Sequence, residues 1–363
     1  MSSDDQRPAE TVATTGDQWV IGHGHQRAVV TEVGATLRSF TVSEQPVIGG
    51  FGTSEWSHGG RGQVLAPWPN RLGDGRYTFE GTTSQAPLNE PDRRNAIHGL
   101  VRWLPWRMSG RAQNRVSMAC VLHPSPAYPY TLGLQVEYRL GRDGLTVVTD
   151  AENLGSDPLP FGLGFHPYLV VGPRGAPVDT ARLTVPAGLR LVTDERGLPT
   201  GEVPVVGTEL DFIGGRVLGA TRLDTAFTGL RRDPDGRVRV TLETGTAPTE
   251  AASGSEAGSG AGQGAGQGAG QGAGQGAGQG AGQGAGQGAG STTGPRAVTL
   301  WADERFDYVM VYTGDTLADE GQRRRSVAIE PMTCPPDAFR SGAGLVVLRP
   351  GARWTGSWGI SPR

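Results

Sequence analysis

The sequence contains no lysine, so arginine carries every basic position of the chain other than its histidines. Its formal net charge of −3 gives no strong field of either sign, which disfavours nucleic acid and anionic membranes as partners. Long apolar runs are also missing, and no stretch reaches the ~18 consecutive apolar residues that a membrane span requires. We therefore expect a chain that binds neither nucleic acid nor membrane.

Cysteine is scarce as well. Cys120 and Cys334 lie far apart and match no metal or redox spacing, so we expect two reduced, buried thiols in a cytoplasmic protein. Residues 1–17 are polar and lack the basic start and apolar run of a signal peptide, so we expect a disordered tail there. The sequence does not choose between a monomer and a homodimer.

Glycine is abundant, and much of it lies in one low-complexity segment. The tetrapeptide Ala-Gly-Gln-Gly repeats without interruption over residues 261–288. Such sequence cannot bury apolar surface to offset its ordering entropy, so we expect a flexible loop insertion at about residues 244–294. Its flanks, residues 238–243 and 297–301, alternate as two strands of one hairpin do. A single domain over residues 18–363 follows.

Short alternating segments recur through the rest of the chain. Residues 134–140 and 145–150 alternate on either side of a Gly-Arg-Asp-Gly turn, which predicts a β-hairpin. No long amphipathic helical pattern accompanies them, so we expect an all-β fold, a large antiparallel β-sandwich. Further strands are expected at residues 28–33, 37–42, 76–80, 309–312, 327–330 and 345–348.

Two of the six histidines have surroundings that suit chemistry. His98 follows an apolar residue and precedes a glycine, which permits close approach by a ligand. His166 lies in an apolar, glycine-rich run that should desolvate its ring. Taken alone, each is more commonly a structural histidine. His23 and His25 lack a third ligand at a recognisable spacing, so we predict no metal site.

Glu330 is the third residue of a candidate acid–base site. It ends the apolar run of residues 327–330 and precedes Pro331. A carboxylate among apolar neighbours is costly to ionise, so partial burial should raise the pKa of Glu330. A raised pKa is what a general base needs near neutral pH, whereas a histidine pKa of about 6.5 nearly suits an acid already.

Six short motifs follow one another along the chain: Pro-Asn-Arg-Leu-Gly-Asp-Gly (69–75), Asn-Ala-Ile-His-Gly (95–99), Gly-Phe-His-Pro-Tyr (164–168), Leu-Asp-Thr-Ala-Phe (223–227), Val-Tyr-Thr-Gly-Asp (311–315) and Ile-Glu-Pro-Met-Thr (329–333). In this order they resemble the aldose 1-epimerases, also called galactose mutarotases. The resemblance spans roughly residues 34–358 and implies a galactose mutarotase-like supersandwich, in agreement with the strand pattern.

The resemblance implies that Glu330 is the base and His166 the acid of an isomerase that interconverts the α and β anomers of a free hexose. Glu330 would take the proton of the C1 hydroxyl while His166 protonates the ring oxygen, and the opened sugar would rotate about C1–C2 and close again. No metal and no organic cofactor is needed, because a hemiacetal is labile enough for acid–base catalysis. The implied substrate-binding residues are His98, Asp224, Arg71 and Asn70.

The particular sugar stays open. The chain departs from the best-known galactose mutarotases in Ala-Pro-Trp-Pro-Asn-Arg (66–71) and His-Gly-Leu-Val-Arg-Trp (98–103). A guanidinium fork suits a phosphate, sulfonate or carboxylate, so an epimerase for an anionic hexose is an alternative. The arginines near His98 in sequence are Arg93, Arg94, Arg102 and Arg107.

Tryptophans can stack on the apolar face of a sugar ring. We expect Trp103 or Trp68 to line the sugar site, with Trp103 as the predicted binding residue, and Trp106 to be buried in the core.

Two further classes of function compete. A non-catalytic carbohydrate-binding β-sandwich would need neither a base nor an acid, so Glu330 and His166 argue against it. A glycoside-cleaving enzyme would need a second carboxylate near Glu330, and Asp224 is the only candidate.

Overall fold

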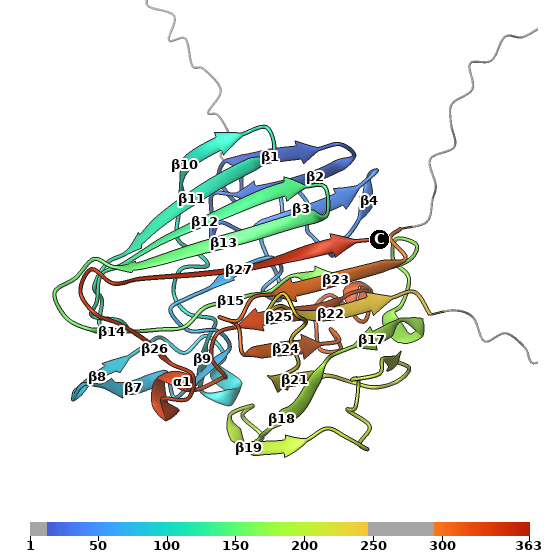
Figure 1. The fold of residues 1–363 in the computed structure, drawn as a ribbon. Coiled ribbons are helices and arrows are strands. Elements are labelled where there is room, and N and C mark those ends of the chain that lie inside the picture. The colour runs from blue at the N-terminus through green and yellow to red at the C-terminus, as the bar shows by residue number, and fades with distance from the viewer. Residues whose placement is uncertain (1–12, 246–293) are drawn as a thin grey trace, which may run out of the picture. The chain divides into compact units, whose positions relative to one another are not determined.

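The computed structural model describes residues 13–245 and 294–363, whose regular secondary structure is almost entirely β-strand (Figure 1). The helical segments within these ranges are short: α1 (Ala338–Ser341), η1 (Pro91–Arg93), η2 (Val178–Thr180) and η3 (Glu320–Gln322). The all-β prediction is confirmed. None of the helices in the described ranges has the length and apolarity to cross a membrane.

The larger sheet has nine strands and is built around the hairpin that the sequence predicts. That hairpin consists of β12 (Leu132–Gly141) and β13 (Gly144–Asn153), paired antiparallel. Every second residue of β12 is buried, because successive side chains of a strand point to opposite faces. The other strands, in sheet order, are β10 (Arg107–Ala112) and β11 (Arg115–Leu122) on one side, and β27 (Arg353–Pro362), β23 (Ala297–Ala302), β22 (Val238–Glu243), β17 (Arg182–Thr184) and β20 (Arg216–Val217) on the other.

A second sheet of eight strands contains Asp224 and Glu330 of the candidate site. Its order is β19 (Pro199–Pro204), β18 (Ala187–Thr193), β21 (Asp224–Leu230), β24 (Tyr308–Tyr312), β25 (Val327–Met332), β15 (Gly164–Phe165) and β5 (Val64–Leu65), with β16 (Tyr168–Leu169) also paired to β25.

The two sheets pack on each other through one apolar core. The rings of Phe165 in β15 and Trp358 in β27 lie 4.9 Å apart between centroids. Val309 of the smaller sheet and Val240 and Leu300 of the larger one belong to the same buried cluster. The predicted antiparallel β-sandwich is therefore confirmed.

Strand β25 is buried on both faces. Val327 and Ile329 belong to the main core, whereas Ala328 and Met332 belong to two smaller apolar clusters. Glu330 shares the face of Ala328 and Met332, because side chains alternate along a strand. The sheet therefore places this carboxylate on its face away from the main core, yet shielded from water.

Smaller sheets and hairpins complete the domain. The N-terminal sheet orders β1 (Gln18–His23), β2 (Gln26–Thr31), β3 (Leu37–Val42) and β4 (Gln45–Pro46). Three two-stranded pairs are β6 (Arg71–Gly73) with β9 (Asn95–Ile97), β7 (Arg76–Phe79) with β8 (Thr82–Gln85), and β14 (Leu159–Phe161) with β26 (Val346–Leu348).

The strands that flank the expected insertion pair with each other. β22 and β23 are antiparallel from Val238 opposite Ala302 to Glu243 opposite Ala297, as the predicted hairpin requires. Residues 246–293 of the insertion and residues 1–12 of the expected tail lie outside the described residues. Residues 13–17, which we assigned to the tail, are described and include a turn in which Thr15 is buried.

Deleting residues 261–288 should leave the melting temperature and the activity nearly unchanged. The deletion removes no residue of β22 or β23, and each doubling of a flexible loop changes its closure free energy by only about 0.6 kcal/mol. Calorimetry of both proteins tests this expectation. A clear fall in melting temperature would show that the segment contributes to folding.

Candidate active site

Glu330 and His166 are in contact. His166 Nε2 lies 3.3 Å from Glu330 Oε1. Glu330 comes from the middle of β25, and His166 from the turn between β15 and β16, which both pair with β25. Sheet pairing therefore brings together two side chains that are far apart in sequence.

Both members of this pair are buried, with exposed fractions of 5% for His166 and 2% for Glu330. Burial raises the pKa of Glu330 well above its ordinary value; the negative charge of Asp224 adds to this shift and Arg71 opposes it. Burial lowers the pKa of His166 to about 3. The raised pKa that we predicted for Glu330 is confirmed, and the nearly ordinary pKa that we expected for His166 is wrong, because its ring is fully desolvated. These opposite shifts favour the form of the pair in which Glu330 carries the proton and His166 is neutral.

His98 lies beside this pair. The ring centroids of His98 and His166 are 5.2 Å apart, edge to face. Burial lowers the pKa of His98 well below its ordinary value, and His166, Arg102 and Arg71 lower it further. His98 therefore offers a neutral imidazole, which can donate and accept hydrogen bonds.

The backbone at His98 and Asn70 adopts the left-handed region, with φ of 67° and 54°. The two residues are tied together, since His98 N–H donates to the Asn70 carbonyl oxygen at 2.8 Å. Such conformations cost roughly 1–3 kcal/mol each in residues other than glycine, and they cluster at functional sites. Asn70 directly precedes β6 and His98 directly follows β9, so both residues lie at the same end of this strand pair.

Arg71 is held by a carboxylate that the sequence analysis missed. Its Nε donates to Glu90 Oε2 at 3.0 Å and its Nη2 to Glu90 Oε1 at 3.1 Å, a forked ion pair. Nη2 also lies 3.5 Å from Asp224 Oδ2. Glu90 further accepts a bond from Asn95 Nδ2 at 2.8 Å. The guanidinium is thereby fixed between Glu90 and Asp224.

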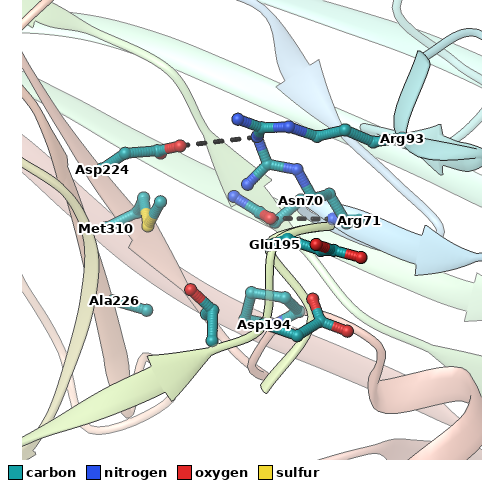
Figure 2. A pocket seen from close by; sticks show the side chains of 11 residues that line it. Asn70, Arg71, Arg93, Asp194, Glu195, Asp224, Ala226 and Met310 are labelled. Carbon is teal, nitrogen blue, oxygen red and sulfur yellow. Dashed lines mark hydrogen bonds and ion pairs between the residues drawn. The ribbon is translucent and has the colours of Figure 1, made fainter. Parts of the chain in front are cut away.

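A cavity of about 180 Å³ opens beside these groups (Figure 2). Asn70, Arg71 and Asp224 line it together with Met310. Met310 is the register partner of Glu330, so the cavity adjoins the Glu330–His166 pair although neither residue is part of its lining. The other lining residues are Arg93, Thr193, Asp194, Glu195, Gly197, Ala226 and Pro336.

Three buried polar atoms of the cluster have no hydrogen-bond partner among the residues described: His98 Nδ1, His166 Nδ1 and Glu330 Oε2. A buried polar group left unpaired costs about 1–3 kcal/mol, so proteins rarely keep several in one place. Hydroxyl groups of a bound molecule can donate to and accept from such atoms. The cluster therefore has the unpaired buried atoms that a bound polar molecule could satisfy.

Comparisons with known proteins identify the family of the chain. Residues 17–250 match the sequence profile of the family described as Aldose 1-epimerase. The chain belongs to the aldose 1-epimerase family. The predicted family is thus confirmed, and with it the mutarotase-like fold.

Individual relatives of this aldose 1-epimerase family member differ in how much they cover. The chain is 29% identical to the uncharacterized protein YihR of Escherichia coli strain K12 over 338 residues, which are 93% of the chain and 90% of that protein. It is 32% identical to the galactose mutarotase of Rattus norvegicus over 161 residues, 42% of the chain and 44% of that protein. The crystal structure of the GalM/aldose epimerase homologue from C. elegans matches with a TM-score of 0.72 at 17% identity, covering 96% of this chain and 98% of that chain.

The tryptophans near the candidate site are placed differently from one another. Trp106 is buried, as predicted. Trp68 is also buried and packs edge-on against Phe339, with its indole nitrogen unpaired among the described residues. Trp103 is 48% exposed, and the Arg102 guanidinium lies 5.2 Å from its ring centroid. It is not part of the cavity lining, so its role in sugar binding stays a prediction.

The four arginines near His98 in sequence do not form one cluster. Arg93 lines the cavity, whereas the exposed Arg94 faces Asp74 at 3.5 Å. Arg107 begins β10 in the other sheet, and Arg102 is half-buried next to Trp103. The cavity lining has more carboxylates than guanidiniums, which does not favour an anionic ligand.

Metal ligation finds no support in the described ranges, where no group of three or more His, Cys, Asp or Glu residues could hold an ion. The two cysteines, Cys120 and Cys334, are free and buried as expected. Burial raises the pKa of the Cys334 thiol to about 12, which makes it a poor nucleophile.

Proposed function

We propose that this chain is a mutarotase that interconverts the α and β anomers of a free aldose. The observation that carries the proposal is the 3.3 Å contact between the buried Glu330 and His166. The two oxygens that exchange protons in a hemiacetal, the C1 hydroxyl and the ring oxygen, are bonded to the same carbon. An acid and a base that touch each other match two reacting atoms that are this close.

The ring-opening step uses the form of the pair in which His166 is protonated and Glu330 is ionised. Burial disfavours this form, and a C1 hydroxyl that donates to the Glu330 carboxylate would offset part of that cost. Glu330 takes the proton of the C1 hydroxyl, and the electron pair of that O–H bond forms the C1 carbonyl. The bond from C1 to the ring oxygen then breaks, and the ring oxygen takes the proton of His166. The pair then has its proton on Glu330, the form that burial favours.

Ring closure runs the same transfer in reverse after rotation about C1–C2. His166 takes the proton of the C5 hydroxyl while that oxygen attacks the other face of the carbonyl, and Glu330 returns a proton to the C1 oxygen. Each such transfer by a positioned group contributes around 10²–10⁴-fold. The proton count of the pair is unchanged over the cycle.

The remaining groups would hold the sugar. Arg71 and Asp224 provide donors and acceptors at the wall of the cavity, and Asn70 lies next to them. Neutral His98 can donate a hydrogen bond to a sugar hydroxyl or accept one from it. The surplus of carboxylates in the cavity lining supports an uncharged hexose over an anionic one.

Saturation-transfer NMR of anomer exchange across neutral, phosphorylated and sulfonated hexoses tests this proposal. We expect catalysed exchange of at least one neutral hexose above the rate of buffer without protein. Exchange of charged sugars alone would replace the neutral substrate by an anionic one. Binding of a sugar without catalysed exchange would identify a carbohydrate-binding domain instead.

A further inference from the structure

Arg61 is a buried cation that has no carboxylate partner among the residues the structure describes. Only 6% of its surface is exposed. Its Nη1 donates to the His58 carbonyl oxygen at 3.1 Å, while Nη2 is buried and unpaired. A buried guanidinium without an opposite charge lowers the stability of a fold. A contribution to stability therefore does not explain why Arg61 is at this position.

Arg61 begins a stack of three side chains that ends at the acid–base pair. Its guanidinium carbon lies 5.1 Å from the centroid of the Tyr168 ring, a cation–π contact. The Tyr168 ring is stacked on the ring of His166, with centroids 5.0 Å apart and planes inclined by 15°. The plane of His166 is therefore defined by Tyr168, which is itself covered by Arg61.

Residues 57–63, here called the His166 loop, hold the stack from the backbone side. Tyr168 Oη donates to the Gly59 carbonyl oxygen at 2.7 Å, and Gly62 N–H donates to the His166 carbonyl oxygen at 2.9 Å. Gly60 has φ of +77°, and a Cβ there would lie 2.6 Å from His166 Cδ2. Only glycine lets the loop approach the imidazole this closely.

We propose that Arg61 is a positioning residue for the reaction proposed above: through Tyr168 and the His166 loop it holds the His166 ring with Nε2 toward Glu330. The proposal rests on the mutarotase function. Arg61 acts on the reaction only through His166, since its contacts are with Tyr168 and the loop.

Arg61 also acts on His166 through its positive charge. Arg61 and Arg102 both oppose a positive imidazole and lower the pKa of His166 in addition to burial. The other groups that face the ring are Glu330, Tyr168 and His98, of which Tyr168 is neutral because burial raises its pKa. Removing the Arg61 charge therefore raises the pKa of His166. In a bell-shaped pH–rate profile, the limb set by His166 should then move to higher pH.

The test compares Arg61→Met and Arg61→Lys with the wild type in kcat, KM and pH–rate profile. Arg61→Met keeps the apolar stem, and we expect kcat to fall about tenfold with KM unchanged, because a misplacement of about 1 Å can lower a rate ~10²-fold. The limb of its bell that is set by His166 should move to higher pH. Arg61→Lys keeps the charge, so its bell should stay in place while kcat is only partly restored.

Arg38→Met is the matched control. Arg38 also donates to a single backbone carbonyl, that of Phe51, and has a buried unpaired Nε, but it has no contact with the stack. We expect its kcat and bell to equal those of the wild type. If Arg61→Met does not fold, Tyr168→Phe removes only the bond to Gly59 and should lower kcat at unchanged KM.

An unmoved bell and unchanged kcat per folded Arg61→Met molecule would overturn the positioning role while leaving the mutarotase in place. Absence of catalysed exchange in the wild type across the whole hexose panel would instead overturn the proposed function. A lower melting temperature with wild-type kcat and bell would assign Arg61 to stability alone and reject the inference.

Discussion

Glu330→Gln should lower kcat for anomer exchange by about 10²–10⁴-fold while sugar binding stays measurable. The amide keeps the shape of the side chain and a hydrogen-bonding oxygen, but it cannot take the C1 proton. Polarimetry measures kcat, and calorimetric titration measures binding. Glu304→Gln, which changes an exposed glutamate, serves as the control and should behave like the wild type.

The same substitution should stabilise the fold increasingly as the pH rises. Glu330 has a raised pKa in the folded protein and a pKa of about 4.3 when unfolded. Between these two values the folded state binds more protons than the unfolded state, so wild-type stability falls with rising pH and the Gln variant lacks this loss. A melting-temperature difference that does not grow with pH, or an unchanged kcat, would contradict the assigned role of Glu330.

His166→Asn should lower kcat by about 10²-fold or more at nearly unchanged sugar binding, because the amide donates a hydrogen bond but releases no proton. The wild-type bell, whose apparent pKa values belong to the pair, should lose its shape in this variant. If His166 were only a core histidine, the variant would lose thermal stability and keep both kcat per folded molecule and the bell.

Acid stability provides an independent readout for His166. The pKa of His166 is about 3 in the folded protein, against about 6.5 for an unfolded histidine. Between these values the unfolded chain binds more protons, so wild-type stability falls as the pH drops through this window, by up to about 1.4 kcal/mol per pH unit. His166→Asn should lose less stability over the same range, as urea titrations at several pH values would show.

The fold was predictable where strands have one buried face and one face toward solvent. β12 alternates along its whole length, and β3 and β22 have the predicted bounds. β27 and β18 escaped prediction for physical reasons. β27 contains glycines such as Gly359, where a Cβ would lie 2.3 Å from the Leu145 carbonyl oxygen, so close packing replaces alternation. β18 has partly buried residues in succession, which leaves no period to detect.

The candidate site was predicted from sequence motifs. The residues that the prediction missed lie outside these motifs. The sequence pointed to Glu330, His166 and His98 because each had local surroundings that suit chemistry. Glu90 and Arg61 escaped because their roles arise from loops that bring them to Arg71 and Tyr168. No periodicity or spacing encodes such contacts. The pKa of His166 likewise required knowledge of what covers its ring.

The insertion divides the candidate site into two polypeptide segments. A cut between Gly245 and Gly294 would separate the strands from β23 to β27, with Glu330, from the rest of the chain. The N-terminal fragment would keep His166 and the sugar-binding candidates, and it would lack the proposed base together with Met310 and Pro336 of the cavity lining. If the proposed mutarotation is confirmed, neither half should turn over a sugar alone, and mutarotation by a mixture would measure their reassembly. Such a pair of fragments would be a split enzyme, in which the association of two attached bait proteins is detected by a change in optical rotation.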